Sequence, residues 1–277
     1  MRLAVSNIAW EVAEDEQVAE LLHAYQVDAI DIAPGKYFPE PAMADAADIR
    51  RLRAWWADRG MEITGMQALL FGTSGLNMFG DSSVQTAMLD RLEAVCRIGA
   101  GLGATRLVFG SPKNRDRQSL TDEEALAMAT EFFRRLGDIA ANHATIICLE
   151  PNPGAYGCNF MLNTDEAARI VRLVDHPAIR LQLDTGALAL NQEDPERTIA
   201  AHGELIGHAH ASEPHLVVLG DGDARHADAA RALKRHAPVD LVSIEMVASK
   251  SEPHLAAIER AVSVADRYYR TDTWHQT

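Results

Sequence analysis

The chain has 277 residues, of which 47% are hydrophobic and 24% charged, enough apolar material for one large domain with its own core. Its formal net charge of −14 argues against a nucleic-acid partner, because that affinity depends on Lys and Arg neutralising phosphates. No apolar run approaches the roughly 18 residues that a membrane span needs, so no membrane partner is expected.

The cysteines and the N-terminal segment bear on the cellular compartment. Cys96, Cys148 and Cys158 are an odd number at unrelated spacings, which is not a disulfide framework. Residues 1–17 are acidic and have no long apolar stretch, unlike a signal peptide. A reducing compartment is the simpler interpretation, and we expect a cytoplasmic protein.

Short apolar runs alternate with amphipathic segments along the whole chain. The predicted strands are 2–7, 28–33, 62–68, 105–110, 145–150, 179–184, 205–210 and 240–245. The predicted helices between them are 14–26, 45–60, 84–102, 121–142, 164–175, 194–203, 225–236 and 254–269. An open doubly wound sheet would normally show a glycine-rich loop after its first strand, and this chain has none there. We therefore predict an α/β fold, a single-domain (β/α)8 TIM barrel over 1–270, with a C-terminal tail at 271–277.

Two long loops follow the third and fourth predicted strands, on the face where such barrels build their active sites. The first, 69–83, is punctuated by glycine and carries Phe71, Met78 and Phe79. It is interpreted either as a lid over a ligand or as a loop packed on its own barrel. The second loop, 110–119, is basic, and a solvated surface loop is favoured there over an anion site.

Four predicted strands end in a residue that can bind a metal ion. Glu150, Asp184, His210 and Glu245 follow one another at steps of 34, 26 and 35 residues. A barrel averages roughly 31 residues per βα unit, so each falls at the carboxyl end of a successive strand. Because those ends converge on one mouth, the four side chains are expected to bind one divalent cation.

The types of these residues indicate which cation is expected. Three carboxylates and one imidazole suit Mn²⁺ best, with Mg²⁺ or Co²⁺ as alternatives. Strand residues two positions apart share a face, which places His208 beneath His210 and Gln182 beneath Asp184. We expect His208 and Gln182 to orient the ligands through hydrogen bonds. Two glutamates facing each other across a pocket could also transfer protons.

The chain resembles the xylose-isomerase-like superfamily of sugar isomerases and epimerases, and within it the ketose 3-epimerase branch. The similarity is carried by LEPNPGAYGCNFMLNTDEAARIV, LQLDTGAL, IGHAHASEP and VSIEM. The resemblance implies that Glu150, Asp184, His210 and Glu245 bind the metal, and that Glu150 and Glu245 are also the catalytic proton-transferring pair. It further implies a small carbohydrate-like substrate and a homodimer or homotetramer.

The expected substrate pocket is partly typical of that branch. Candidate substrate-binding residues are Asn7, Trp10, Gln67, Phe71 and His215. However, Ala187 stands where the family usually has a histidine, and Leu216 stands where an arginine is common. The segment 155–157 replaces one that often offers a further glutamate.

These departures leave three functions open. The first is a metal-dependent isomerase or epimerase acting on a sugar-like carbonyl compound by glutamate-mediated proton transfer. The second is a dehydratase or another lyase of the same superfamily. The third is a catalytically inactive sugar-binding or accessory barrel, which the changes at Ala187 and Leu216 motivate.

Overall fold

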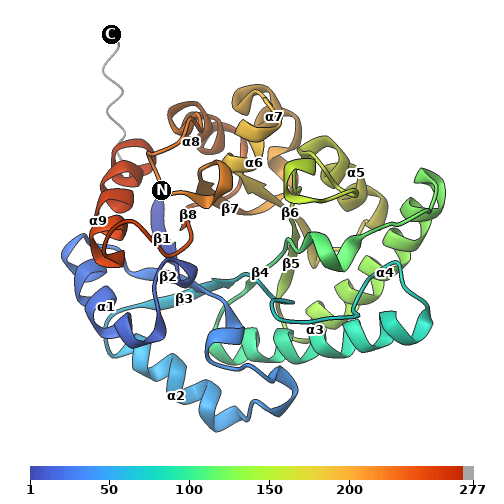
Figure 1. The fold of residues 1–277 in the computed structure, drawn as a ribbon, viewed down its shortest axis with the longest axis horizontal. Coiled ribbons are helices and arrows are strands. Elements are labelled where there is room, and N and C mark those ends of the chain that lie inside the picture. The colour runs from blue at the N-terminus through green and yellow to red at the C-terminus, as the bar shows by residue number, and fades with distance from the viewer. Residues whose placement is uncertain (271–277) are drawn as a thin grey trace.

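Eight parallel strands form a closed barrel in the computed structural model, which describes residues 1–270 (Figure 1). Each strand pairs with the next in the chain, and the last pairs with the first. The predicted TIM barrel is confirmed, whereas the predicted tail at 271–277 lies outside the described residues. The strands are β1 (Arg2–Ser6), β2 (Ala29–Ile32), β3 (Glu62–Met66), β4 (Arg106–Phe109), β5 (Ile146–Leu149), β6 (Ile179–Asp184), β7 (Ile206–Ser212) and β8 (Leu241–Glu245).

The longer α-helices surround the barrel as an outer ring, and the short α6 lies inside this ring at the end of β6 (Figure 1). The α-helices are α1 (Asp15–Ala24), α2 (Ala46–Ala57), α3 (Ser82–Leu102), α4 (Asp122–Asn142), α5 (Thr164–Val174), α6 (Thr185–Leu190), α7 (Pro195–His202), α8 (His226–His236) and α9 (His254–Ala265). The short helix α6 was not predicted. It begins directly after β6 because the Asp184 carboxylate accepts the backbone N–H of Ala187 and so caps the first turn.

Side-chain caps fix where two of the long helices begin. Thr121 and Glu124 form a reciprocal capping box at the start of α4. The side chain of Asn163 accepts the backbone N–H of Glu166 and starts α5. Both helices begin at the residues that their sequence signals predicted. The loops that precede them follow β4 and β5, and they therefore lie on the carboxyl-terminal side of the barrel.

A polar layer fills the middle of the barrel, where TIM barrels usually pack Val, Ile and Leu. Cys148, Gln182, His208 and Ser243 are all buried there. Gln182 is paired in register with His208, and Asp184 is paired with His210 two residues further along the same strands. The layer therefore lies directly beneath the predicted ligands.

Two structural features relate to the expected compartment. Cys96, Cys148 and Cys158 are buried and unpaired. Among residues 1–270, no helix combines the length and the apolar character needed to cross a bilayer.

Candidate metal centre and substrate pocket

A pocket of about 970 Å³ opens at the carboxyl ends of the strands. Its floor includes Glu150, Asp184 and Glu245, and its wall includes Gln67 and Tyr156. Pockets of roughly 300–1,000 Å³ hold small-molecule ligands in proteins, and in TIM barrels they lie at this face. Three of the four predicted ligand residues therefore line a pocket large enough for a substrate, and the fourth, His210, is completely buried.

The four predicted ligand residues converge at the bottom of this pocket. One ligand atom from each of Glu150, Asp184, His210 and Glu245 lies within 4.8 Å of all the others. The Nδ1 atom of His210 is central, at 3.1 Å from Glu245 Oε2, 3.5 Å from Glu150 Oε1 and 4.0 Å from Asp184 Oδ2. The geometry has the form of a cation site with one imidazole and three carboxylates.

The two glutamates are held in matching ways. Gln67 Nε2 donates to Glu245 Oε1 at 2.6 Å, which leaves Oε2 facing His210. Asn152 Nδ2 donates to Glu150 Oε2 at 3.1 Å, which leaves Oε1 facing the same imidazole. Each carboxylate thus has one oxygen fixed by an amide and the other directed at the centre of the cluster.

The charges of this cluster are poorly balanced by the protein alone. Burial, followed by the charges of Glu245 and Glu150, raises the pKa of Asp184 to about 8. Burial opposes ionisation of His210, but the charges of the nearby Glu245 and Glu150 carboxylates raise the pKa of His210 well above its usual range. His210 in turn lowers the pKa of Glu245 against the effect of burial.

These residues fit a divalent ion on structural grounds. Both ring nitrogens of His210 and Oε1 of Glu150 are buried without a hydrogen-bond partner. Buried polar atoms are rarely left unpaired unless an ion or ligand completes them. The backbone of Gly110 also packs closely against the Glu150 carboxylate, because a Cβ added at this glycine would lie 2.0 Å from Glu150 Oε2.

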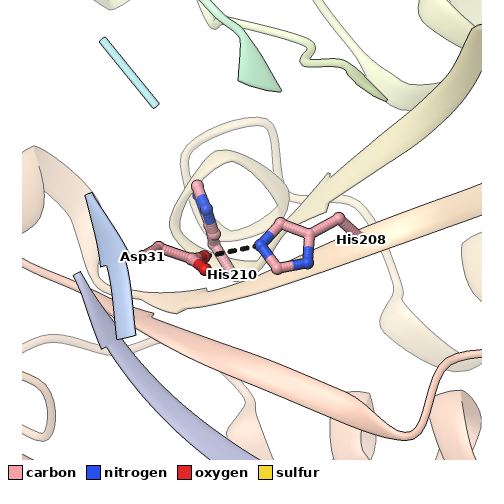
Figure 2. Close-up of side chains that lie close together, drawn as sticks. All are labelled: Asp31, His208 and His210. Carbon is pink, nitrogen blue, oxygen red and sulfur yellow. Dashed lines mark hydrogen bonds and ion pairs between the residues drawn. The ribbon is translucent and has the colours of Figure 1, made fainter. Parts of the chain in front are cut away.

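Two further polar residues, Asp31 and His208, lie next to His210 (Figure 2). His208 Nε2 lies 2.7 Å from Asp31 Oδ2, and the His208 and His210 rings meet edge to face at 5.3 Å. Thr64 also donates to Asp31 at 2.9 Å. Asp31 was not predicted, although an acidic residue within the apolar strand DAIDIA is a signal that could have identified it. We propose that Asp31 and His208 hold His210 in position.

Gln182 is completely buried, as expected for the layer beneath the ligands. Its Nε2 atom donates to the backbone oxygen of Leu183 at 3.3 Å, while its Oε1 atom has no partner. Its role in orienting Asp184 stays a prediction.

Two of the five predicted substrate-binding residues do not line the pocket. After β1 the chain turns into a short 3-10 helix, so Asn7 directs its Oδ1 atom to the backbone N–H of Ala33 at 2.7 Å. Trp10 is buried outside the pocket, where its Nε1 atom donates to Asp15 at 2.7 Å and its ring meets Trp56 edge-on. Asn7 and Trp10 therefore lie outside the pocket lining, whereas Gln67, Phe71 and His215 do line the pocket.

The predicted lid is only partly present. Phe71 is 80% exposed at the pocket mouth. Met78 is buried, with its backbone N–H bound to Asn114 at 2.9 Å, and Phe79 packs edge-on against Phe160 with ring centroids 4.9 Å apart. The second half of the 69–83 loop is thus packed on the barrel, because its apolar residues find partners in the neighbouring loops.

The basic loop after β4 also differs from expectation. Arg115 is completely buried rather than solvated, and its NH1 atom donates to the backbone oxygen of Glu150 at 2.6 Å. Arg117 pairs with Asp122 at the start of α4. Arg115 therefore supports the backbone that carries Glu150 and places a positive charge near the acidic cluster.

The loop after β7 is pinned by Glu213, a buried acid that sequence reasoning did not single out. It accepts the backbone N–H groups of Gly220 at 2.9 Å and Ala224 at 3.0 Å, and it lies 3.0 Å from His226 Nε2. This network holds His215 against Tyr156, whose hydroxyl accepts the His215 backbone N–H at 2.8 Å. Tyr156 thereby becomes a further pocket residue, in the segment where the family often has a glutamate.

Replacing Glu213 by Gln should destabilise the protein by about 1–3 kcal/mol at neutral pH, because the buried carboxylate that binds two backbone amides and His226 becomes a neutral amide that cannot accept at both positions. Burial opposes ionisation, but the hydrogen bonds from His226 and two backbone amides lower the pKa of Glu213 below its usual range. The carboxylate therefore contributes stability above the unfolded pKa of about 4.3, and this contribution is lost as the pH falls through the folded pKa. Urea unfolding between pH 3 and 7 should show a shallower acid dependence in the variant than in the wild type. Equal slopes would contradict this assignment.

The chain is a TIM barrel with a candidate metal site at its mouth, and sequence comparison identifies its family. Residues 19–267 match the xylose isomerase-like TIM barrel family, to which the chain belongs. A curated relative, the L-ribulose 3-epimerase of Methylomonas sp. (strain DH-1), is 30% identical over 112 residues. That match covers 40% of this chain and 39% of the relative.

Several solved structures share the fold along nearly the whole chain. The D-psicose 3-epimerase of Clostridium cellulolyticum H10, solved with D-tagatose, superposes with a TM-score of 0.80 at 17% identity and covers 98% of both chains. The 3-keto-D-glucoside 4-epimerase of E. coli has a TM-score of 0.77 at 16% identity, covering 95% of this chain and 98% of its own. The IOLI protein, solved with a zinc atom, has a TM-score of 0.76 at 20% identity, covering 98% and 100%.

Proposed function

We propose that this protein is a metal-dependent isomerase or epimerase that acts on a sugar or sugar-like carbonyl compound. Several of its structural neighbours are named as sugar epimerases, and the pocket floor carries the residues that such chemistry needs. The observation that supports this proposal most strongly is the paired arrangement of Glu150 and Glu245. Each has one oxygen fixed by an amide side chain and the other directed at the His210 imidazole.

The proposed cation would be held by Glu150, Asp184, His210 and Glu245. When bound there, a divalent ion supplies Lewis-acid polarisation of a carbonyl, which makes the adjacent C–H more acidic. Mn²⁺ is the proposed ion, with Mg²⁺ or Co²⁺ as alternatives, because oxygen ligands predominate. Asp31 and His208 would keep the His210 ring oriented, as carboxylate–histidine pairs do around metal sites.

The two glutamates would perform the proton transfer. One removes the proton beside the substrate carbonyl, and the other delivers a proton to the opposite face of the same carbon. Gln67 and Asn152 keep the two carboxylates in place during this exchange, since each donates to one oxygen. The protein backbone that carries Glu150 is additionally held by Arg115. Inversion at one carbon, with exchange of its hydrogen, follows from this arrangement.

Solvent exchange tests the proposal directly. The metal-loaded protein should place deuterium from D₂O on a carbon next to the carbonyl of a turned-over substrate, in a panel of free ketoses and keto-glycosides followed by NMR. A protein that binds metal and sugar yet exchanges no hydrogen with solvent across this panel would instead be a sugar-binding barrel. Loss of water from the substrate would identify the dehydratase or lyase alternative, because the same proton abstraction precedes elimination.

Two further expectations accompany this proposal. The three unpaired cysteines of the chain support a reducing, cytoplasmic location for the protein. A homodimer or homotetramer is proposed from family resemblance, and light scattering of the purified protein would measure the assembly.

A further inference from the structure

The pocket has two chemically different halves. Its inner half carries the acidic cluster together with Gln67 and Asn152. Its outer half is lined mainly by apolar side chains from four separate loops: Ile8, Leu69, Phe71, Leu216 and Val247. At about 970 Å³, the pocket also lies at the upper end of the range for small-molecule sites. There is space beyond a single sugar ring, and that space is apolar.

Two of these outer residues are exposed to an unusual degree for their type. Phe71 is 80% exposed and Val247 is 46% exposed, although both are held in place by their backbones. The N–H of Phe71 donates to Ala68 at 3.0 Å, and the N–H of Val247 donates to Leu216 at 3.0 Å. Exposed apolar side chains that gather around one pocket mark a binding surface more often than chance exposure.

The backbone of the outer wall supports the same conclusion. Ala68, His215 and Leu216 have φ values of 54°, 61° and 54°, in the left-handed region that non-glycine residues rarely adopt. Such strain persists where the surrounding structure imposes it, and it gathers at ligand sites. Here it presents Leu216 to the pocket, at the position where a family arginine would offer hydrogen bonds.

The charged side chains that line the pocket outside the acidic cluster are of mixed sign: Glu11, Lys36 and Lys250. Lys36 Nζ donates to the backbone oxygens of Asn7 and Trp10, and the acidic Glu11 lines the same wall. Tyr156, His215 and Lys250 also line the pocket, but apolar side chains predominate, so much of the outer half offers no donor or acceptor to a sugar hydroxyl. A hydroxyl buried there without a partner would lose its hydrogen bonds to water, whereas an apolar group would gain from burial.

We infer that the substrate is a keto-sugar carrying an apolar, ring-sized substituent, as in an aryl glycoside, with the sugar over the acidic cluster and the substituent against Phe71, Leu216 and Val247. This inference rests on the proposed function for the placement of the carbonyl. Because a glycosidic substituent occupies the anomeric carbon, the carbonyl must lie elsewhere on the ring. An oxidation of a ring hydroxyl must therefore supply this substrate.

A matched pair of probes tests the inference. Phenyl and methyl 3-keto-β-D-glucoside share one sugar and differ only in the apolar group. Calorimetry with the Mn²⁺-loaded protein should show that the phenyl probe binds about tenfold tighter or more, because its ring is removed from water. Phe71→Ser should reduce this ratio to about twofold or less. Leu173→Ser is the control, since Leu173 is 40% exposed on α5 and does not line this pocket.

Two results would overturn the inference. One is equal affinity for both probes in the wild type. The other is a ratio of phenyl to methyl affinity that Phe71→Ser leaves unchanged. If that variant also alters the oligomeric state, the apolar rim is a contact surface for a second copy of the chain. Deuterium exchange separates this test from the proposed function. Exchange without a phenyl preference overturns only the inference, whereas a phenyl preference without exchange on any probe overturns only the proposed chemistry.

Discussion

Replacing either Glu150 or Glu245 by Gln is expected to lower the turnover rate on the order of 10²-fold or more, as losses of general acid–base groups typically do. Glutamine keeps the shape and the hydrogen bond from Asn152 or Gln67, but it cannot accept and return a proton. Because both glutamates lie within 3.5 Å of His210 Nδ1, each substitution should also weaken the metal site. Rates must therefore be measured at saturating Mn²⁺, with metal content determined for each variant.

The control for this prediction is Glu20→Gln on the outer face of α1, where the side chain is exposed. It removes one carboxylate without touching the pocket, so turnover should stay unchanged. The acid–base assignment would be contradicted if a fully metal-loaded Glu150→Gln or Glu245→Gln protein retained the wild-type rate. If only one substitution has a large effect, that glutamate alone transfers protons, and inversion by a two-sided exchange is excluded.

Removal of divalent metal is expected to destabilise the wild-type protein. Metal at about 100 times its Kd stabilises by about 2.7 kcal/mol, which corresponds to a melting temperature about 5–10 °C higher. The reason is local, since the three carboxylates of this cluster repel one another without an ion between them. Thermal melts with EDTA, followed by addition of Mn²⁺ or Mg²⁺, would measure the effect and rank the ions.

Asp184→Asn should largely remove this dependence on metal, and it thus distinguishes a metal site from a purely structural cluster. The asparagine can still cap α6 through its side-chain oxygen, as Asp184 does at 2.6 Å from the Ala187 nitrogen. The amide carries no charge at any pH, whereas crowding and burial raise the pKa of Asp184 to about 8, so the metal-free variant should be at least as stable as the metal-free wild type. Its melting temperature should respond weakly to Mn²⁺. A variant that gains as much from metal as the wild type would remove Asp184 from the proposed ligand set.

The amino-acid sequence by itself determined the barrel and the convergence of the four candidate ligands. Alternating strand and helix signals gave the order of the elements, and in a closed parallel barrel every strand ends at the same face. The positions of Glu150, Asp184, His210 and Glu245 follow from this rule, since strand ends meet whatever the loops do. The caps at Thr121 and Asn163 were likewise predictable, because they depend on residues three or fewer positions away.

Only the tertiary structure decided how side chains beside these strand ends point. Asn7 and Trp10 leave the pocket because the chain turns directly after β1 and offers them partners at Ala33 and Asp15. Asp31 becomes part of the centre through His208, 177 positions along the chain, and local sequence signals cannot specify a contact of that range. The burial of Arg115 beneath Glu150 is of the same kind. Local hydrogen bonds and periodicity are encoded in neighbouring residues, whereas these contacts exist only once the barrel has closed.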